Sequence, residues 1–167
     1  TDNGCYGLDI GEDLPSLINN VSEIPGEFRI RVGMLNPMFM PRIKNNLLKS
    51  FENDKVFRFL HVPVQSGSNN VLNNMKRGHT VETFKNVVKE FRTKFGPFTI
   101  STDIIVGYPT ETEEDFQKTV KLLKETRPDI INLSRYSQRP GTVASEMPQL
   151  DTVEVKRRSK RITDIVN

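Results

Sequence analysis

Strand-like and helix-like segments alternate along this chain, and no short turn of the kind that joins antiparallel strands separates the strand-like ones. Strands that are separated by helices pair in parallel, with each helix crossing over the sheet. The hydrophobic periodicity predicts strands at residues 28–34, 56–64, 98–106 and 129–136, and helices at 14–21, 41–51, 69–76, 81–95, from 112 onward and at 153–166. The sequence therefore predicts an α/β fold with about four parallel strands.

Side chains suited to helix capping precede three of the predicted helices. Asp13 precedes the first helix, Ser68 the third and Thr112 the fifth. Their short side chains accept hydrogen bonds from the free N–H groups of a first helical turn. We therefore expect Asp13 to cap the first helix and Thr112 to start the fifth, whereas Ser68 can cap the third helix, contact a ligand, or do both.

A closed (β/α)8 barrel needs about 250 residues, whereas this chain has 167. Four strands form only part of such a barrel, and the turn-like Asp2-Asn3-Gly4 at the start follows no strand or helix. The sequence has no secretion signal and no apolar stretch long enough to cross a membrane. We therefore expect residues 1–167 to be a piece of a longer, globular protein.

Cys5 is the only cysteine in the sequence. A single cysteine excludes an internal disulfide, and it excludes any metal or iron–sulfur site built from several cysteines of this chain. It also fits a reducing compartment, so the expected location is the cytoplasm.

The net charge is +3, but it is unevenly distributed. Residues 42–95 carry eleven basic and four acidic side chains, whereas residues 1–41 carry two basic and six acidic ones. A basic segment beside acidic neighbours indicates a surface that faces a polyanion. Lysine and arginine are also common on solvated helix faces, so both interpretations stay open at this stage.

Polar and glycine-rich clusters follow each predicted strand. They comprise residues 36–37, 65–68, 107–112 and 138–142. In parallel α/β folds ligands bind at the edge where the strands end. One such cluster is typical of an ordinary loop, but four at the same edge predict a binding pocket.

Residues in these clusters match particular ligand groups. Gln65, Ser66 and Gly67 offer an amide, a hydroxyl and exposed backbone N–H groups, which suit ribose or carboxylate oxygens. Gly107 allows the backbone to approach a flat ligand such as adenine. Glu111 either accepts hydrogen bonds from a ligand or stabilises the start of the next helix.

Charged residues near the same edge allow a functional and a structural interpretation. Arg77 can hold a carboxylate or phosphate in its guanidinium fork, or it can join Lys76 in compensating a helix dipole. Asp103 lies within an apolar strand and must be paired or functional if it faces inward. His61 is expected to be a buried, hydrogen-bonded histidine, and His79 to lie on the surface.

Five motifs run nearly from end to end of the sequence. They are Asp2-Asn3-Gly4-Cys5-Tyr6-Gly7, residues 59–68, Met75-Lys76-Arg77, residues 103–109 with Glu111-Thr112, and Arg139-Pro140-Gly141-Thr142. Together they resemble the radical S-adenosylmethionine (radical SAM) methylthiotransferases, the MiaB-like tRNA-modifying enzymes. The resemblance is greatest to the archaeal and eukaryotic subgroup that acts on threonylcarbamoyladenosine in tRNA.

This resemblance implies a partial (β/α)6 barrel of the TIM type that binds SAM and 4Fe–4S clusters. It implies reductive cleavage of SAM to a deoxyadenosyl radical, followed by insertion of a methylthio group into the adenine of tRNA position 37. The expected partner is the anticodon stem-loop of tRNA. The residues expected to contact SAM are Asp2, Gln65, Ser66, Gly67, Arg77, Asp103, Gly107, Pro109 and Glu111, with Asn36, Lys76 and Arg139 as weaker candidates for substrate contacts.

The sequence departs from the family pattern in two respects. The C-x-x-x-C-x-x-C run that holds the cluster is absent, and Cys5 does not occupy one of its positions. The strand-end motif often reads Pro-Gly-Glu-Thr, and Thr110 replaces its glycine here. We therefore expect residues 1–167 to be the C-terminal part of the barrel, without metal ligands, without the N-terminal cysteine-bearing and C-terminal RNA-binding domains, and inactive alone.

Alternative functions remain at this stage. Related methylthiotransferases act on isopentenyladenosine in tRNA or on a ribosomal protein. The basic segment also fits a non-enzymatic RNA-binding module. A barrel of the aldolase or isomerase type, with His61 or Lys76 in catalysis, is disfavoured because no phosphate-binding loop is recognisable.

Overall fold

A computed structural model describes residues 2–166, with side chains up to residue 165. The chain divides into two compact units. The first comprises Thr1–Pro63 with Glu82–Ser101, and the second comprises Val64–Val81 with Thr102–Asn167. Strand β2 (Thr99–Val106) runs from the first unit into the second, so one strand contributes to both.

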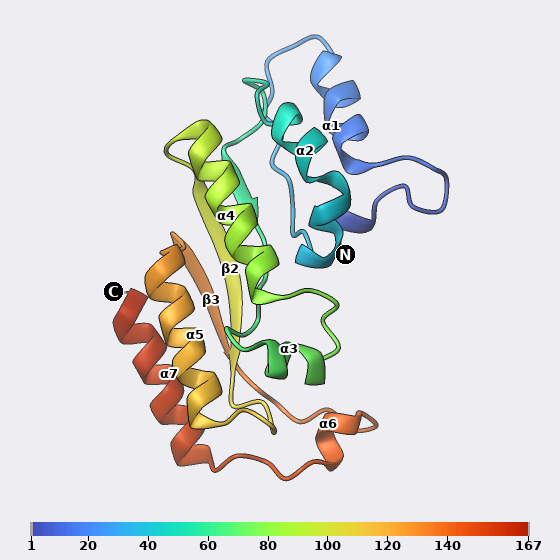
Figure 1. The fold of residues 1–167 in the computed structure, drawn as a ribbon. Helices are drawn as coiled ribbons and strands as arrows, with labels where there is room; N and C mark the ends of the chain where they lie inside the picture. Colours follow the sequence, from blue (N-terminus) through green and yellow to red (C-terminus); the bar gives the residue numbers. More distant parts are fainter. Residues whose placement is uncertain (1, 167) are drawn as a thin grey trace. The chain divides into compact units, whose positions relative to one another are not determined.

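The first unit consists mainly of helices around a short piece of parallel sheet. Its elements are η1 (Asn3–Cys5), α1 (Leu14–Glu23), η2 (Pro37–Phe39), α2 (Met40–Ser50), β1 (Phe59–His61) and α4 (Val81–Phe95). Helices α1 and α2 lie side by side (Figure 1). β1 pairs in parallel with the first half of β2, with Phe59 opposite Thr99 and His61 opposite Ser101.

Aromatic side chains form the core of the first unit. Phe51 and Phe91 are almost fully buried, and their ring centroids lie 5.5 Å apart in an edge-to-face arrangement. Phe98 meets the ring of Phe91 at 5.2 Å. Rings packed in this way contribute about 0.5–1.5 kcal/mol per pair beyond their buried area. Phe91, one of the apolar residues that recur with a 3.6-residue period in α4, thus packs the helix against Phe51 and Phe98.

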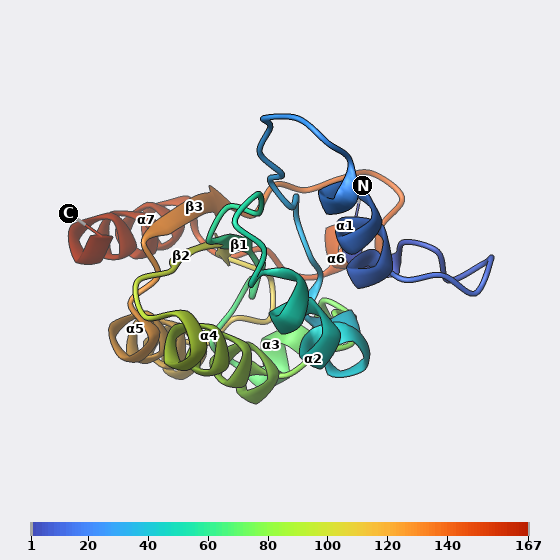
Figure 2. The ribbon, with the colours of Figure 1, turned by 90° about the horizontal axis from the view of Figure 1, so that it is seen from above.

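The second unit packs helices against the second half of β2 and against β3. Its elements are α3 (Asn69–Asn74), α5 (Glu113–Thr126), β3 (Ile130–Arg135), α6 (Val143–Glu146) and α7 (Thr152–Val166), and the sheet order is β1-β2-β3. Helix α7 lies along β3 and contacts α5 (Figures 1 and 2). Thr112 stands at the predicted start of α5 and caps it in a reciprocal bond pattern with Asp115.

Most predicted elements are confirmed, including the Asp13 cap of α1. Two predicted strands are exceptions: only Phe59–His61 of segment 56–64 forms a strand, and segment 28–34 bonds to segment 56–64 only at its two ends. Isolated parallel bridges join Ile30 to Val56 and Met34 to His61, so no continuous ladder forms. The short helix α6 was not predicted. No helix among the described residues is long and apolar enough to cross a membrane.

Candidate functional site

Strand β2 has two different faces in the second unit. Thr102, Ile104 and Val106 are completely buried on one face. Asp103 and Ile105 point to the other face and are only half-buried. The alternation confirms that Thr102 faces away from Asp103, and it places a carboxylate on the more open side of the sheet.

Asp103 is paired with Asn132 of β3. The Asn132 amide donates a hydrogen bond to Oδ1 of Asp103 at 2.8 Å. Burial lowers the pKa of Arg77, and the charge of Asp103 offsets part of that shift. We expected Asp103 to be paired or functional, and the hydrogen bond from Asn132 shows that it is paired. Its carboxylate remains half-exposed, so it can also accept a hydrogen bond from a ligand hydroxyl or amino group.

Gln65, four residues after β1, has a strained backbone conformation. Its φ is 72°, in the left-handed region that favours glycine, and its side chain is 93% buried. The backbone is fixed by bonds from Gln65 N–H to the Asp103 carbonyl (2.8 Å) and from Ile105 N–H to the Gln65 carbonyl (2.9 Å). Backbone strain that is retained at a buried residue is typical of a functional site.

Ser66 and Gly67 are turned toward α5. The Ser66 hydroxyl is buried 3.4 Å from Oγ1 of Thr119, and the Gly67 N–H donates to that oxygen at 2.8 Å. A Cβ on Gly67 would lie 2.4 Å from Cα of Thr119. The prediction that these groups are exposed donors is therefore wrong, because α5 packs directly onto the loop.

Ser68 does not cap α3. Its hydroxyl donates instead to Oδ1 of Asp115 in α5 at 2.6 Å, and the first turn of α3 has no side-chain cap. Asp115 also accepts the bonds that close the Thr112 capping box. The capping interpretation of Ser68 is therefore wrong: its hydroxyl binds Asp115, and no N–H of the first turn of α3 donates to it.

Helix α3 ends in a left-handed turn that carries Lys76 and Arg77. The Lys76 N–H donates to the Asn73 carbonyl at 2.9 Å and the Arg77 N–H to that of Leu72 at 3.0 Å, which is the Schellman pattern. Lys76 occupies the position that glycine favours, with φ 55°. Its exposed ammonium has no ion pair with a described residue. The Nε of Arg77 is buried and has no partner among those residues.

His79 is buried, so the prediction of a surface position is wrong. Its Nδ1 lies 3.2 Å from the carbonyl oxygen of Arg77 and its Nε2 lies 3.3 Å from that of Val64. Burial lowers the pKa of the imidazole. The ring thus fills the space between the strand end and the Arg77 turn. His61 in the first unit is only half-buried, contrary to the prediction.

The loop after β2 begins at Gly107 with φ 81°. A Cβ at this position would lie 2.6 Å from Cγ2 of Val155 in α7, and the Gly107 N–H donates to Oε2 of Glu111 at 2.8 Å. The fold itself therefore requires glycine here. Val155 occupies the side of Gly107 toward which a Cβ would point, and an approach of adenine to this backbone stays a prediction.

Glu111 is held by a buried ion pair with Arg158 of α7. Nη1 of Arg158 lies 2.7 Å from Oε2 of Glu111, and the two side chains are 5% and 0% exposed. Burial raises the pKa of Glu111, while the Gly107 N–H and Arg158 act against that shift. The other oxygen, Oε1, is buried without a partner among the described residues. Glu111 is therefore a buried group, not a solvated carboxylate at a helix start.

Three other predicted residues lie in separate surroundings. In the first unit, Oδ1 of Asp2 accepts bonds from the N–H groups of Gly4 (2.8 Å) and Asn36 (3.1 Å), and Oδ1 of Asn36 accepts one from Met38 (3.1 Å). These bonds shape η1 and η2. In the second unit, Arg139 is exposed in the loop before α6. Ligand contacts by the three residues stay predictions.

The residues that the structure describes do not form a metal centre. No group of three or more His, Cys, Asp or Glu side chains in the described part of the chain could hold a metal ion. Cys5 is exposed, and its thiol donates to the Asp2 carbonyl. These residues therefore do not fit an iron–sulfur cluster.

Two buried polar atoms of the second unit have no partner within the described chain. They are Nε of Arg77 and Oε1 of Glu111. Buried polar groups in proteins almost always have partners, and leaving one unpaired costs about 1–3 kcal/mol. A ligand that carries carboxylate, amino and hydroxyl groups, as SAM does, would supply partners of the required kinds.

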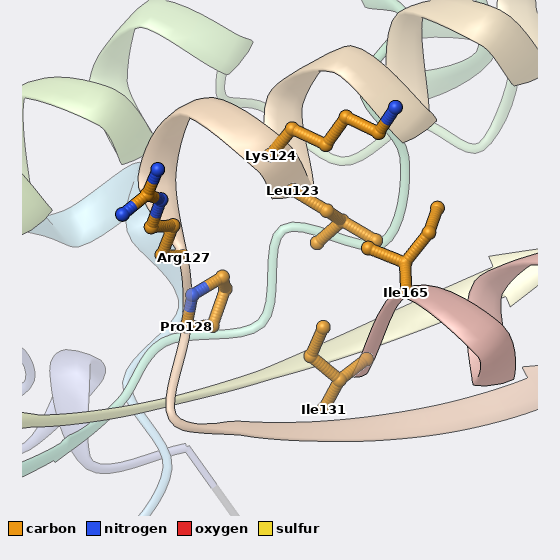
Figure 3. Close-up of a pocket in the computed structure, with 6 residues that line it drawn as sticks. All are labelled: Leu123, Lys124, Arg127, Pro128, Ile131 and Ile165. Carbon is orange, nitrogen blue, oxygen red and sulfur yellow. The ribbon is translucent and has the colours of Figure 1, made fainter. Parts of the chain in front are cut away.

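A hollow of about 410 Å³ lies at the start of β3 (Figure 3). Leu123, Ile131 and Ile165 point into it, and Lys124 and Arg127 lie at its margin. It contains none of the predicted site residues. The hollow is at the N-terminal end of β3, whereas ligands of parallel α/β folds bind at the C-terminal ends of the strands.

Sequence reasoning missed several residues that shape the site. Asn132 and Arg158 were not singled out for a site, and Asn74 was noted only as part of a helix. Asn132 had only a weak signal, as a polar residue within the β3 strand, because its partner Asp103 lies 29 residues earlier. Arg158 had none, since its partner Glu111 lies 47 residues earlier.

Comparisons with known proteins identify the class. The family model described as the radical SAM superfamily matches residues 5–123. The chain therefore belongs to the radical SAM superfamily. The structure of coproporphyrinogen III oxidase from Escherichia coli, described as a radical SAM enzyme, superposes with a TM-score of 0.68 over 89% of this chain and 36% of that one. At 19% identity it supports the fold alone, and it confirms the partial barrel of the α/β class.

Several curated relatives share one name. The chain is 51% identical over 166 residues to a "Probable threonylcarbamoyladenosine tRNA methylthiotransferase" from Archaeoglobus fulgidus, covering 99% of this chain and 39% of that protein. It is 49% identical to the protein of that name from Methanocaldococcus jannaschii, covering 95% and 37%. It is 42% identical to "Threonylcarbamoyladenosine tRNA methylthiotransferase" from Drosophila melanogaster, covering 98% and 30%. The chain thus spans less than two fifths of these relatives.

Proposed function

We propose that this chain is part of a radical SAM methylthiotransferase that acts on threonylcarbamoyladenosine at position 37 of tRNA. The carrying observation is the 51% identity, over 99% of the chain, to an archaeal relative with that printed name. The reaction would add a methylthio group to the modified adenine within the anticodon stem-loop. The proposed location is the cytoplasm.

In this proposal the second unit binds SAM with Gln65, the Arg77 turn and the loop after β2. Arg77 offers a guanidinium whose Nε has no internal partner, which suits the ligand carboxylate. Gln65, with its strained backbone, and Asp103 offer an amide and a carboxylate to hydroxyl or amino groups. Gly107, Pro109 and Glu111 are proposed contacts from the loop after β2. Asp2, in the first unit, is a separate proposed contact.

The iron–sulfur cluster is proposed to be held by cysteines outside the described residues, because Cys5 stands alone. When bound, the cluster and SAM supply the radical chemistry. Residues 1–167 are proposed to form the C-terminal part of the barrel. The cysteine-bearing N-terminal domain, the cluster motif and the C-terminal RNA-binding domain would belong to the rest of the full-length protein. The chain alone is therefore expected to be inactive.

Lys76 and Arg139 are proposed to contact the tRNA, with Asn36 as a further candidate. Lys76 is exposed without an ion pair in the described chain, and Arg139 is exposed in its loop. Cationic side chains of this kind bind phosphates and make affinity dependent on salt.

The test is mass spectrometry of tRNA nucleosides from a strain that lacks the gene. We expect methylthio-threonylcarbamoyladenosine to disappear while its precursor accumulates. Full-length wild type and Lys89→Ala, a change at an exposed residue of α4, should restore it, and Arg77→Ala should not. Unchanged tRNA with an altered ribosomal protein, or loss of methylthio-isopentenyladenosine instead, would contradict the proposed substrate.

A further inference from the structure

Asn74, the last residue of α3, is bonded to the loop after β2 by its backbone and by its side chain. Its carbonyl oxygen accepts a hydrogen bond from the Tyr108 hydroxyl at 3.0 Å. Its amide donates to Oγ1 of Thr110 at 2.9 Å. Tyr108 is 7% exposed, and its ring meets Tyr136 edge-on at 5.4 Å, so the phenol is fixed in place.

These bonds connect two segments that carry candidate ligand contacts. Arg77 follows Asn74 by three residues, within the turn that Arg77 closes by bonding back to Leu72. Because that turn is closed by backbone hydrogen bonds, a displacement of Asn74 is transmitted to Arg77. Glu111 follows Thr110 directly and bonds back to the carbonyl of Tyr108 at 2.8 Å.

We propose that Asn74 and Thr110 are positioning residues that set the spacing between the Arg77 turn and the 107–111 loop around bound SAM. The inference rests on the function proposed above. It also accounts for the departure from the Pro-Gly-Glu-Thr motif, because glycine has no hydroxyl to offer Asn74. Thr110 adds a side-chain link between the two segments that the glycine form lacks.

The variants Thr110→Val, Thr110→Ser and Asn74→Ala in the full-length protein test this proposal. Valine keeps the shape of threonine without the hydroxyl, and serine keeps the hydroxyl. Thr93→Val is the matched control, since Thr93 is exposed on α4 and makes no side-chain bond to a described residue. The SAM dissociation constant is measured by equilibrium dialysis on reconstituted protein, and amide hydrogen exchange is followed in segments 72–78 and 105–112.

We expect Thr110→Val and Asn74→Ala to raise the SAM dissociation constant about threefold to tenfold, the range for losing one neutral hydrogen bond. The double variant should be no weaker than either single one, because both remove the same bond. Thr110→Ser and Thr93→Val should match wild type. Exchange should accelerate in both segments without SAM, while the affinity for tRNA stays within about twofold.

The proposal would be overturned if Thr110→Val kept the SAM affinity and the hydrogen exchange of wild type. It would also be overturned if the affinity for tRNA fell as much as the affinity for SAM, or if Thr110→Ser did not bind SAM like wild type. If the wild-type protein has no methylthiotransferase activity, the proposed function fails. The exchange experiment still decides whether Asn74 and Thr110 couple the two segments.

Discussion

Arg158 of α7 donates a hydrogen bond of 2.7 Å to the carboxylate of Glu111, and a second of 2.9 Å from the same nitrogen to the Glu111 carbonyl. Both side chains are nearly inaccessible to water. The contact therefore fixes the backbone and the side chain of the loop after β2 at the same point. Val155, one turn earlier in α7, fills the space beside Gly107. Contacts from Arg158 and Val155 of α7 therefore hold the loop after β2 in its conformation.

Replacing Arg158 with Met should destabilise the protein strongly. The change leaves the Glu111 carboxylate buried without its counter-charge, and breaking a buried ion pair in this way costs about 3–5 kcal/mol. The double variant Arg158→Met with Glu111→Gln should recover much of that loss. Denaturant unfolding of the full-length protein measures both. A single variant as stable as wild type would show that Glu111 is protonated or hydrated.

Glu154 makes the start of α7 sensitive to acid. Hydrogen bonds from Arg157 and Arg158 lower its pKa to about 2. Because the folded pKa lies below the ordinary value of 4.5, the stabilisation is complete above pH 4.5 and is lost as the pH falls toward 2. Thermal midpoints between pH 5 and 2.5 should therefore fall more steeply for wild type than for Glu154→Gln. Parallel curves would contradict the prediction.

The fold could be predicted from local pattern because strand and helix periods are properties of neighbouring residues. The apolar run of β2 and the caps at Asp13 and Thr112 illustrate this. Segment 28–34 has the same alternation, yet it forms only isolated bridges. Whether a strand-like segment forms a ladder depends on its partner, and the partner is not encoded in the segment.

The site was predicted less completely, because its polar groups find partners far along the chain. Gly67 and Ser66 were expected to be open, but Thr119 takes their hydrogen bonds from a helix some fifty residues away. His79 was expected on the surface, but two carbonyls enclose it. Residue type indicated which side chains were unusual. Only the packing shows which of them remain unpaired and available to a ligand.

His79 should make the Arg77 turn less stable in mild acid. Burial lowers the pKa of His79 below the ordinary value of 6.5. The unfolded chain then binds a proton at a higher pH than the folded one, so stability is complete above pH 6.5 and declines as the pH falls below it. His79→Gln should remove that component, since glutamine can still donate to the Val64 carbonyl. The thermal midpoints of wild type and variant should diverge between pH 7.5 and 5.5.

Variants of Lys76 can distinguish a role in tRNA binding from a role in the stability of the turn after α3. It occupies the left-handed position of the α3 turn with φ 55°, where glycine is the favoured residue. Lys76→Gly should therefore leave the protein as stable or raise its free energy of unfolding by up to about 1 kcal/mol. The exposed ammonium is lost in the same change, so tRNA affinity should fall and the slope of affinity against salt should decrease by about one ion.

Lys76→Arg is the matched control, because it keeps the charge and the side-chain entropy of the position. It should retain both the tRNA affinity and the salt slope of wild type. Filter binding at several salt concentrations gives the affinity, and thermal unfolding gives the stability. Stability lost in Lys76→Gly would assign Lys76 to the turn. Unchanged tRNA binding in Lys76→Gly would instead remove Lys76 from the tRNA contact, and a strained lysine would then stand in this turn without a ligand to account for it.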